Sequence, residues 1–172
     1  MLVVLSGPIK IGKSTLLEKI YLGLKDEFSI GGVITLGQKE RKFLNLKNGE
    51  ERHFKEENEQ KGITIGDYFI AEKAIEFASE AIKDSQDKEI IIIDEIGILE
   101  SEKKCLYEPI RELLNSIKNT EEKFMLLCVR ERVLPQILAL FEMKIDDLWR
   151  INNQPDEEIL NQLKRFIISA KL

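Results

Sequence analysis

The sequence predicts an α/β fold, a doubly wound and mainly parallel β-sheet with helices on both faces. Short apolar runs that suit buried strands alternate with longer segments whose apolar residues recur at helical spacing. Two of these runs end in polar motifs of the kind found at the carboxyl edge of a parallel sheet. The 172 residues contain no repeat or low-complexity linker, which favours a single domain over residues 1–172.

The first motif is a glycine-rich loop near the amino terminus. It reads G-P-I-K-I-G-K-S and matches the phosphate-binding pattern G-x-x-x-x-G-K-[ST]. An apolar run at 2–5 precedes it, and residues 16–24 follow with helical periodicity. A glycine turn without a ligand is the alternative, but a strand before the loop and a helix after it favour phosphate binding.

In such a loop the backbone N–H groups surround the phosphates of a nucleoside triphosphate. The lysine, Lys13, is expected to reach the β- and γ-phosphates, and the Ser14 hydroxyl is expected to bind Mg²⁺. The predicted nucleotide-binding residues are Gly7, Pro8, Ile9, Lys10, Ile11, Gly12, Lys13, Ser14 and Thr15.

The second motif is an acidic pair that closes a strongly apolar run. Four isoleucines at 90–93 precede Asp94 and Glu95. Because parallel strands present their carboxyl ends at one edge, this pair should emerge beside the glycine loop. We expect Asp94 to hold Mg²⁺, through water, and Glu95 to polarise an attacking water. Solubilising charges are the alternative, which the neighbouring loop disfavours.

A further apolar strand is predicted at 124–129, and it ends in Arg130. A glutamate directly after Asp94 is typical of the subclass in which an extra strand lies between the two motif strands. Arg130 would then lie near the γ-phosphate and stabilise transition-state charge, so the predicted catalytic residues are Lys13, Glu95 and Arg130. A solvated arginine at a strand end fits the sequence equally well.

The remaining elements complete the alternation. Strands are expected at 32–36 and 148–151, with a short edge strand and a loop at 63–70. Alternating residues around Asn48-Gly49 predict a β-hairpin at 41–54 with a type I′ turn, within an insertion of about 38–66. Helices are expected at about 71–82, 106–117, 133–141 and 159–170.

Composition narrows the class of protein. The net charge is −5, so nonspecific binding to nucleic acid is not favoured. Two distant cysteines and one histidine make a zinc site very unlikely and fit a reducing cytoplasm. We expect no membrane association, because no apolar run approaches the length of a span. The oligomeric state is left open.

The order of the motifs resembles the small cancer-related nucleoside-triphosphatase family. The resemblance rests on G-P-I-K-I-G-K-S-T, G-G-V-I-T, I-G-D-Y-F, I-I-D-E-I-G-I-L-E and L-C-V-R-E, in that order. It implies Mg²⁺-dependent hydrolysis of several nucleoside triphosphates with little base discrimination. It also implies the roles given above to Lys13, Ser14, Asp94 and Glu95. The segment G-Q-K-E-R-K is less rich in arginine than is usual in the family, so no contact is assigned to it.

Two other functions use the same phosphate machinery. A kinase would need an acceptor pocket and a basic lid, for which the hairpin region offers Lys39, Arg41, Lys42 and Arg52. A GTP-binding switch would fit the D-x-x-G at 94–97, but residues 152–156 do not match the N-K-x-D element that reads guanine. Trp149 is expected to pack at a strand end, with stacking on a nucleotide base as the alternative.

Overall fold

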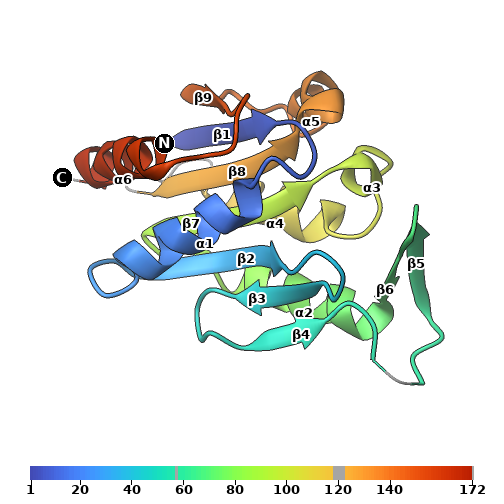
Figure 1. Ribbon diagram of the computed structural model, residues 1–172. Helices are drawn as coiled ribbons and strands as arrows, with labels where there is room; N and C mark the ends of the chain where they lie inside the picture. The colour runs from blue at the N-terminus through green and yellow to red at the C-terminus, as the bar shows by residue number, and fades with distance from the viewer. Residues whose placement is uncertain (57, 118–122, 172) are drawn as a thin grey trace.

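A central β-sheet organises the chain in the computed structural model, which describes residues 1–56, 58–117 and 123–171 (Figure 1). Its seven strands lie in the order β4-β3-β2-β7-β8-β1-β9. Five are parallel, namely β1 (Leu2–Gly7), β2 (Ile30–Leu36), β7 (Ile90–Ile96), β8 (Phe124–Arg130) and β9 (Asp147–Arg150). The predicted fold class is confirmed, and β8 lies between β7 and β1 as the subclass requires.

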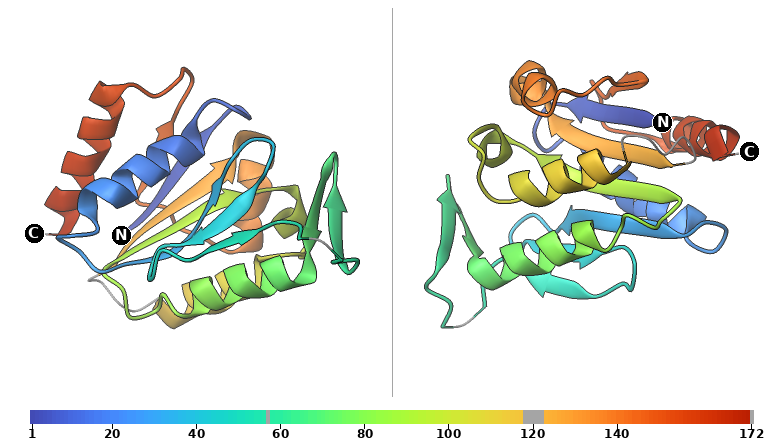
Figure 2. Two further views of the ribbon diagram at one scale, coloured as in Figure 1. Left: turned by 60° about the horizontal axis from the view of Figure 1, so that its bottom comes forward. Right: turned by 180° about the vertical axis from the view of Figure 1, so that it is seen from behind.

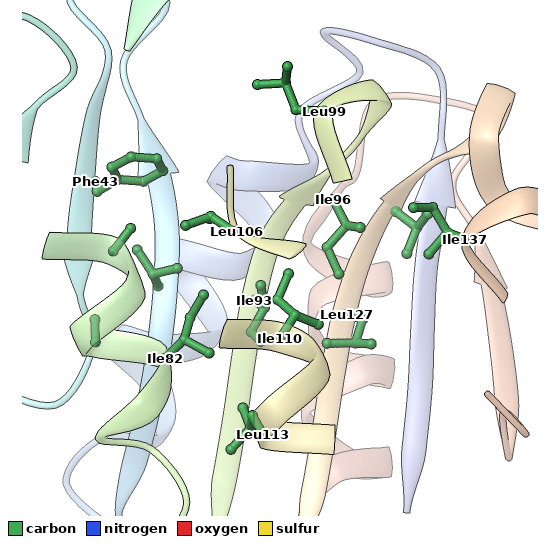
Figure 3. Close-up of a cluster of buried hydrophobic side chains, with 14 of the residues drawn as sticks. Phe43, Ile82, Ile93, Ile96, Leu99, Leu106, Ile110, Leu113, Leu127 and Ile137 are labelled. Atoms are coloured by element: carbon green, nitrogen blue, oxygen red, sulfur yellow. The ribbon is translucent and has the colours of Figure 1, made fainter. Parts of the chain in front are cut away.

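Helices cover both faces of this sheet (Figure 2). On one face lie α1 (Lys13–Leu24) and α6 (Glu157–Lys171), and on the other lie α2 (Glu72–Lys83), α4 (Tyr107–Ile117) and α5 (Leu134–Leu140). Successive side chains of a strand point to opposite faces, so the isoleucines of β7 divide between the two layers. Ile90 and Ile92 pack toward α1 and α6, whereas Ile91 and Ile93 pack toward α2 and α4. Figure 3 shows the second cluster, with Ile93 beside Ile110.

The predicted hairpin extends the main sheet. Its strands β3 (Lys42–Asn45) and β4 (Glu51–His53) add to β2 in antiparallel fashion. The predicted type I′ turn is wrong, because it needs positive φ at both central residues and only Gly49, at +76°, has it; Asn48 does not. The connection is longer: Asn45 N–H donates to the Glu50 carbonyl, and Gly49 N–H donates to the Asn45 carbonyl, each at 2.8 Å. Side-chain bonds to the backbone favour this loop, including Lys47 N–H to Asn45 Oδ1 at 2.9 Å.

A second hairpin replaces the edge strand and loop expected at 63–70. The strands β5 (Gly62–Ile65) and β6 (Tyr68–Ala71) form a separate two-stranded sheet, joined by a turn at Gly66-Asp67. Gly66 has φ +55°, which suits a two-residue hairpin turn. In Figure 1 this hairpin stands at the edge to which the parallel strands point, near the short α3 (Ile98–Ser101).

A 3₁₀ turn, η1 (Glu131–Val133), follows β8 directly. Across the described ranges, every helix is too short or too polar to cross a bilayer.

Candidate active site

A cleft opens at the carboxyl edge of the sheet, where β1, β7 and β8 end. Its volume is about 580 Å³. One wall is the glycine loop with the start of α1, and the opposite wall contains Asp94, Glu95 and Arg130. The tip of the β5–β6 hairpin, including Tyr68, closes a further side. The two motifs that the sequence predicted would meet therefore line one cavity.

The glycines of the loop are required by its geometry. A Cβ on Gly7 would lie 2.2 Å from the Ile151 carbonyl oxygen, so the loop passes against the chain that follows β9. Gly12 precedes α1 with φ +100°, and a Cβ there would lie 3.2 Å from Pro155 Cδ. Neither position tolerates a side chain without movement of its neighbour. The backbone itself therefore shapes this wall.

Lys13 lies across the glycine loop. Its ammonium donates to the Gly7 carbonyl at 2.8 Å and to the Pro8 carbonyl at 2.6 Å. These bonds hold the positive charge over the loop. Of the nine predicted nucleotide-binding residues, those that line the cleft are Ile9, Lys10, Gly12, Lys13, Ser14 and Thr15. Gly7, Pro8 and Ile11 are outside the cleft lining, and Ile11 packs on the α1–α6 core.

Asp94 lies at the floor of the cleft with 2 % of its surface exposed. Its carboxylate accepts the Thr35 N–H at 3.3 Å and interacts by hydrogen bonding with the Ser14 and Cys128 side chains. Burial raises the pKa of Asp94, and these hydrogen bonds oppose the rise. The interaction with Ser14 joins the acidic motif directly to the glycine loop.

Cys128 was predicted to be a small core residue, and it is buried. The structure adds that its thiol faces Asp94. Burial, followed by the negative charge of Asp94, raises the pKa of Cys128 well above the usual thiol value. Cys128 is therefore a neutral donor to the carboxylate. An apolar strand sequence gives no signal for this contact.

Glu95 occupies an unusual backbone position. Its φ is +65°, and a register irregularity between Ile93 and Ile96 interrupts the pairing of β7 with β8. In a regular strand, consecutive side chains point to opposite faces. The bulge and the positive φ allow Asp94 and Glu95 to line the same cleft, although they are adjacent in sequence.

Two arginines bind the Glu95 carboxylate, one at each oxygen. Arg130, at the end of β8, pairs with Oε1, and Arg41, from the β2–β3 connection, pairs with Oε2. Arg130 lies against Gly97, where a Cβ would be 3.1 Å from its Cδ. The structure thus places Arg130 beside Glu95, a contact that the sequence did not predict; its expected role at the γ-phosphate stays a prediction.

The sequence interpretation assigned Arg41 no site contact and included it only in a basic lid. Its side chain is 14 % exposed, and its guanidinium lies 4.8 Å from the Tyr68 ring centroid and 5.2 Å from that of Phe54. Burial lowers the pKa of Arg41, although an arginine remains charged at neutral pH. The position of Arg41 shortly after a strand of the parallel sheet could have indicated that it belongs to the site.

The other basic residues considered for a lid do not line the cleft. Lys42 pairs with Glu51, and Arg52 pairs with Glu59 at 3.1 Å. Lys39 is exposed and lies outside the cleft lining. Carboxylates on and after the β3–β4 hairpin therefore neutralise two of the positive charges that a basic lid would need.

Glu100 braces the chain that follows Glu95. It is buried, and it accepts the Gly97 N–H at 2.8 Å and the Leu106 N–H at 3.3 Å. Burial raises the pKa of Glu100. Burial, with the nearby Glu100 charge, also raises the pKa of Cys105 to about 12, which keeps this thiol protonated at neutral pH. Glu100 fixes the turn against which Arg130 lies.

Trp149 packs away from the cleft. Its indole Nε1 donates to Asp147 at 2.9 Å, and its ring centroid lies 5.7 Å from that of Phe166. Trp149 is not among the cleft-lining residues. The arrangement confirms packing at a strand end and gives no support to base stacking.

A glycine loop between a strand and a helix, facing an acidic strand end across one cleft, defines a P-loop nucleotide-binding protein. Comparison with known families makes the class specific. Residues 2–163 match the family model described as NTPase, and the chain belongs to that family.

Relatives and solved structures agree with this assignment. The chain is 26% identical over 156 residues to "Nucleoside-triphosphatase THEP1" of Archaeoglobus fulgidus, covering 86% of this chain and 90% of the relative. It is 27% identical over 121 residues to the protein of the same name from Caldivirga maquilingensis, covering 66% and 69%.

The fold is similar to the solution structure of a human cancer-related nucleoside triphosphatase, with a TM-score of 0.67, 21% identity and coverage of 98% and 95%. It is also similar to the crystal structure of THEP1 from Aquifex aeolicus, with a TM-score of 0.64, 20% identity and coverage of 97% and 99%.

Proposed function

We propose that this protein is a Mg²⁺-dependent nucleoside-triphosphatase that releases phosphate from several nucleoside triphosphates with little base discrimination. The observation that carries the proposal is that Lys13 and Ser14 of the glycine loop line the same cleft as Asp94 and Glu95. The family match and the names of the relatives support the same activity.

The residues present suit a magnesium ion. The Ser14 hydroxyl and the Asp94 carboxylate are hard oxygen donors, which Mg²⁺ prefers, together with water and phosphate oxygens. Asp94 is buried, and burial penalises its ionised form. A divalent cation would stabilise that form. When bound, Mg²⁺ would neutralise charge on the β- and γ-phosphates.

The remaining chemistry belongs to the chain itself. Glu95 orients a water in line with the γ-phosphorus and accepts its proton. The new bond joins the water oxygen to the γ-phosphorus, the bond from that phosphorus to the β–γ bridging oxygen breaks, and the diphosphate leaves. The loop N–H groups, Lys13 and Arg130 stabilise the charge that spreads over the phosphoryl oxygens.

The sequence argues against a dedicated guanine site, which is compatible with low base discrimination. Residues 152–156 read N-N-Q-P-D where a guanine-reading N-K-x-D would stand. The free Cys105 and Cys128 fit the reducing cytoplasm that we propose as the location.

The test is phosphate release from ATP, GTP, CTP and UTP, each with and without Mg²⁺. We expect release from all four that requires the ion. Release from one nucleotide alone would contradict low base discrimination, and release without a divalent ion would contradict the metal role. Negligible phosphate release by hydrolysis, together with rapid transfer of the γ-phosphoryl group to a small acceptor detected by mass spectrometry, would show that the protein is a kinase instead.

A further inference from the structure

The carboxylate that should activate water is not free in this structure. Both oxygens of Glu95 are paired, one with Arg41 and the other with Arg130. Each guanidinium occupies one of the hydrogen-bond acceptor positions of this carboxylate. A water that Glu95 orients must share these oxygens with the two guanidiniums unless one of the pairs opens.

Arg41 is held in place by more than its ion pair. Its guanidinium lies near the rings of Tyr68 and Phe54, and most of its surface is buried. The Tyr68 hydroxyl also donates to the Gln38 carbonyl at 3.4 Å, which ties the β5–β6 hairpin to the loop that carries Arg41. These contacts fix the orientation of the guanidinium and of its planar N–H donors. Fixed planar donors suit the recognition of a phosphate group.

Arg41 also lies within electrostatic range of the phosphate machinery. The charge of Asp94 acts on Arg41, and Arg130 and Arg41 act on each other as like charges. All three line the cleft that contains Lys13. A phosphate group between Lys13 and Glu95 would therefore contact the guanidiniums of Arg41 and Arg130, which in this structure share the single carboxylate of Glu95.

We propose that Arg41 is a ligand of the γ-phosphate, and that this phosphate displaces Glu95 from Arg41 and Arg130. This inference rests on the proposed function. A terminal phosphate carries up to two negative charges and three acceptor oxygens, so it competes well against one carboxylate for these donors. Displacement frees Glu95 to bind water only when a triphosphate is present. A diphosphate lacks the group that competes and leaves the pairs closed.

The test measures equilibrium affinity for a non-hydrolysable triphosphate analogue and for the matching diphosphate, both with Mg²⁺. Arg41→Ala should weaken triphosphate binding by about 10-fold or more, the order expected for a charged hydrogen bond, and change diphosphate binding less than about 2-fold. Glu95→Gln should tighten triphosphate binding several-fold, because it removes the competitor, and leave diphosphate binding unchanged. Lys42→Ala is the matched control, since Lys42 neighbours Arg41 but pairs with Glu51 outside the cleft.

Two further variants separate the ligand role from a structural one. Arg41→Lys conserves the positive charge and should leave the fold close to that of the parent. It should therefore retain part of the preference for the triphosphate over the diphosphate. Tyr68→Ala should lower that preference, whereas Tyr68→Phe, which retains the ring but loses the hydroxyl bond to Gln38, should lower it less. Arg41 is overturned as a γ-phosphate ligand if Arg41→Ala and Arg41→Lys weaken both nucleotides equally, or neither. If the variants show the expected changes in triphosphate and diphosphate affinity but the parent protein releases no phosphate, the proposed hydrolysis is wrong and the inference about Arg41 still holds.

Discussion

The two walls of the cleft are built in different ways. The glycine-loop wall is contained in residues 7–15, and its shape follows from backbone conformation at positions such as Gly12. The opposite wall combines Asp94 and Glu95 of β7 with Arg130 at the end of β8 and Arg41 in the β2–β3 connection. These residues meet only through the order of the sheet. The first wall is a local property of the sequence, whereas the second depends on tertiary structure and is held by side-chain pairs that a ligand can exchange.

The loop wall is tested most severely by Lys13→Ala. The ammonium is held over the loop by two carbonyls, and its loss removes a charge expected at the β- and γ-phosphates. We expect kcat/KM to fall by about 10³-fold or more, with a weaker triphosphate affinity measured by calorimetry.

Lys19→Ala is the matched control for this experiment. Lys19 lies on the same helix and pairs with the exposed Glu157 at 3.2 Å, away from the cleft. Its activity should equal that of the parent. Triphosphate affinity unaltered by Lys13→Ala would show that the loop does not bind phosphate.

The opposite wall is tested by Glu95→Gln. The amide retains the shape of the side chain but cannot accept the proton of the attacking water. We expect kcat to fall by about 10²–10⁴-fold without any loss of nucleotide affinity. Steady-state kinetics with a separate binding measurement would check both parts. Unchanged turnover would remove Glu95 from the mechanism.

A comparison of two glycines measures how tightly the loop wall is constrained. Gly12 and Gly49 both have positive φ, at +100° and +76°, but only Gly12 has a neighbour near the Cβ position, Pro155. Gly49→Ala should cost about 1–2 kcal/mol of unfolding free energy, the general penalty for a left-handed residue. Gly12→Ala should cost more and should also weaken triphosphate binding. Equal unfolding free energies from denaturant titration would show that the contact with Pro155 adds no constraint.

The smallest expected effect is a change in pH dependence at Glu100. Its pKa is raised in the folded protein, so between the unfolded and folded values the folded state binds more protons. The stability of the parent relative to Glu100→Gln should therefore decrease as pH rises from about 4 through the raised pKa. Denaturant unfolding of both proteins over this range measures the difference. A relative stability that increases with pH would contradict the assigned direction.

Most of the fold could be predicted because its signals are local. Four consecutive β-branched isoleucines favour a strand buried on both faces, and the structure distributes them between the two cores. The glutamate after Asp94 indicated where β8 belongs in the sheet, and this order is confirmed. The turn type at Asn48-Gly49 was wrong because side-chain hydrogen bonds, such as that to Asn45, select a longer loop.

The site was predicted less completely because part of it depends on contacts distant in sequence. Arg41 and Tyr68 meet across two hairpins, and periodicity does not report which of several basic residues turns inward. Likewise, the positive φ of Glu95 belongs to a β-bulge that an apolar run does not reveal. The contact of Cys128 with Asp94 arises between neighbouring strands.

The central claim is that both walls act on the γ-phosphate of a bound triphosphate. It is tested most directly by hydrolysis of ATP with Mg²⁺ in ¹⁸O-labelled water, followed by mass spectrometry of the products. Attack at the γ-phosphorus predicts one solvent-derived ¹⁸O in the released orthophosphate and none in the diphosphate. Label in the diphosphate, or no release of orthophosphate, would contradict the mechanism.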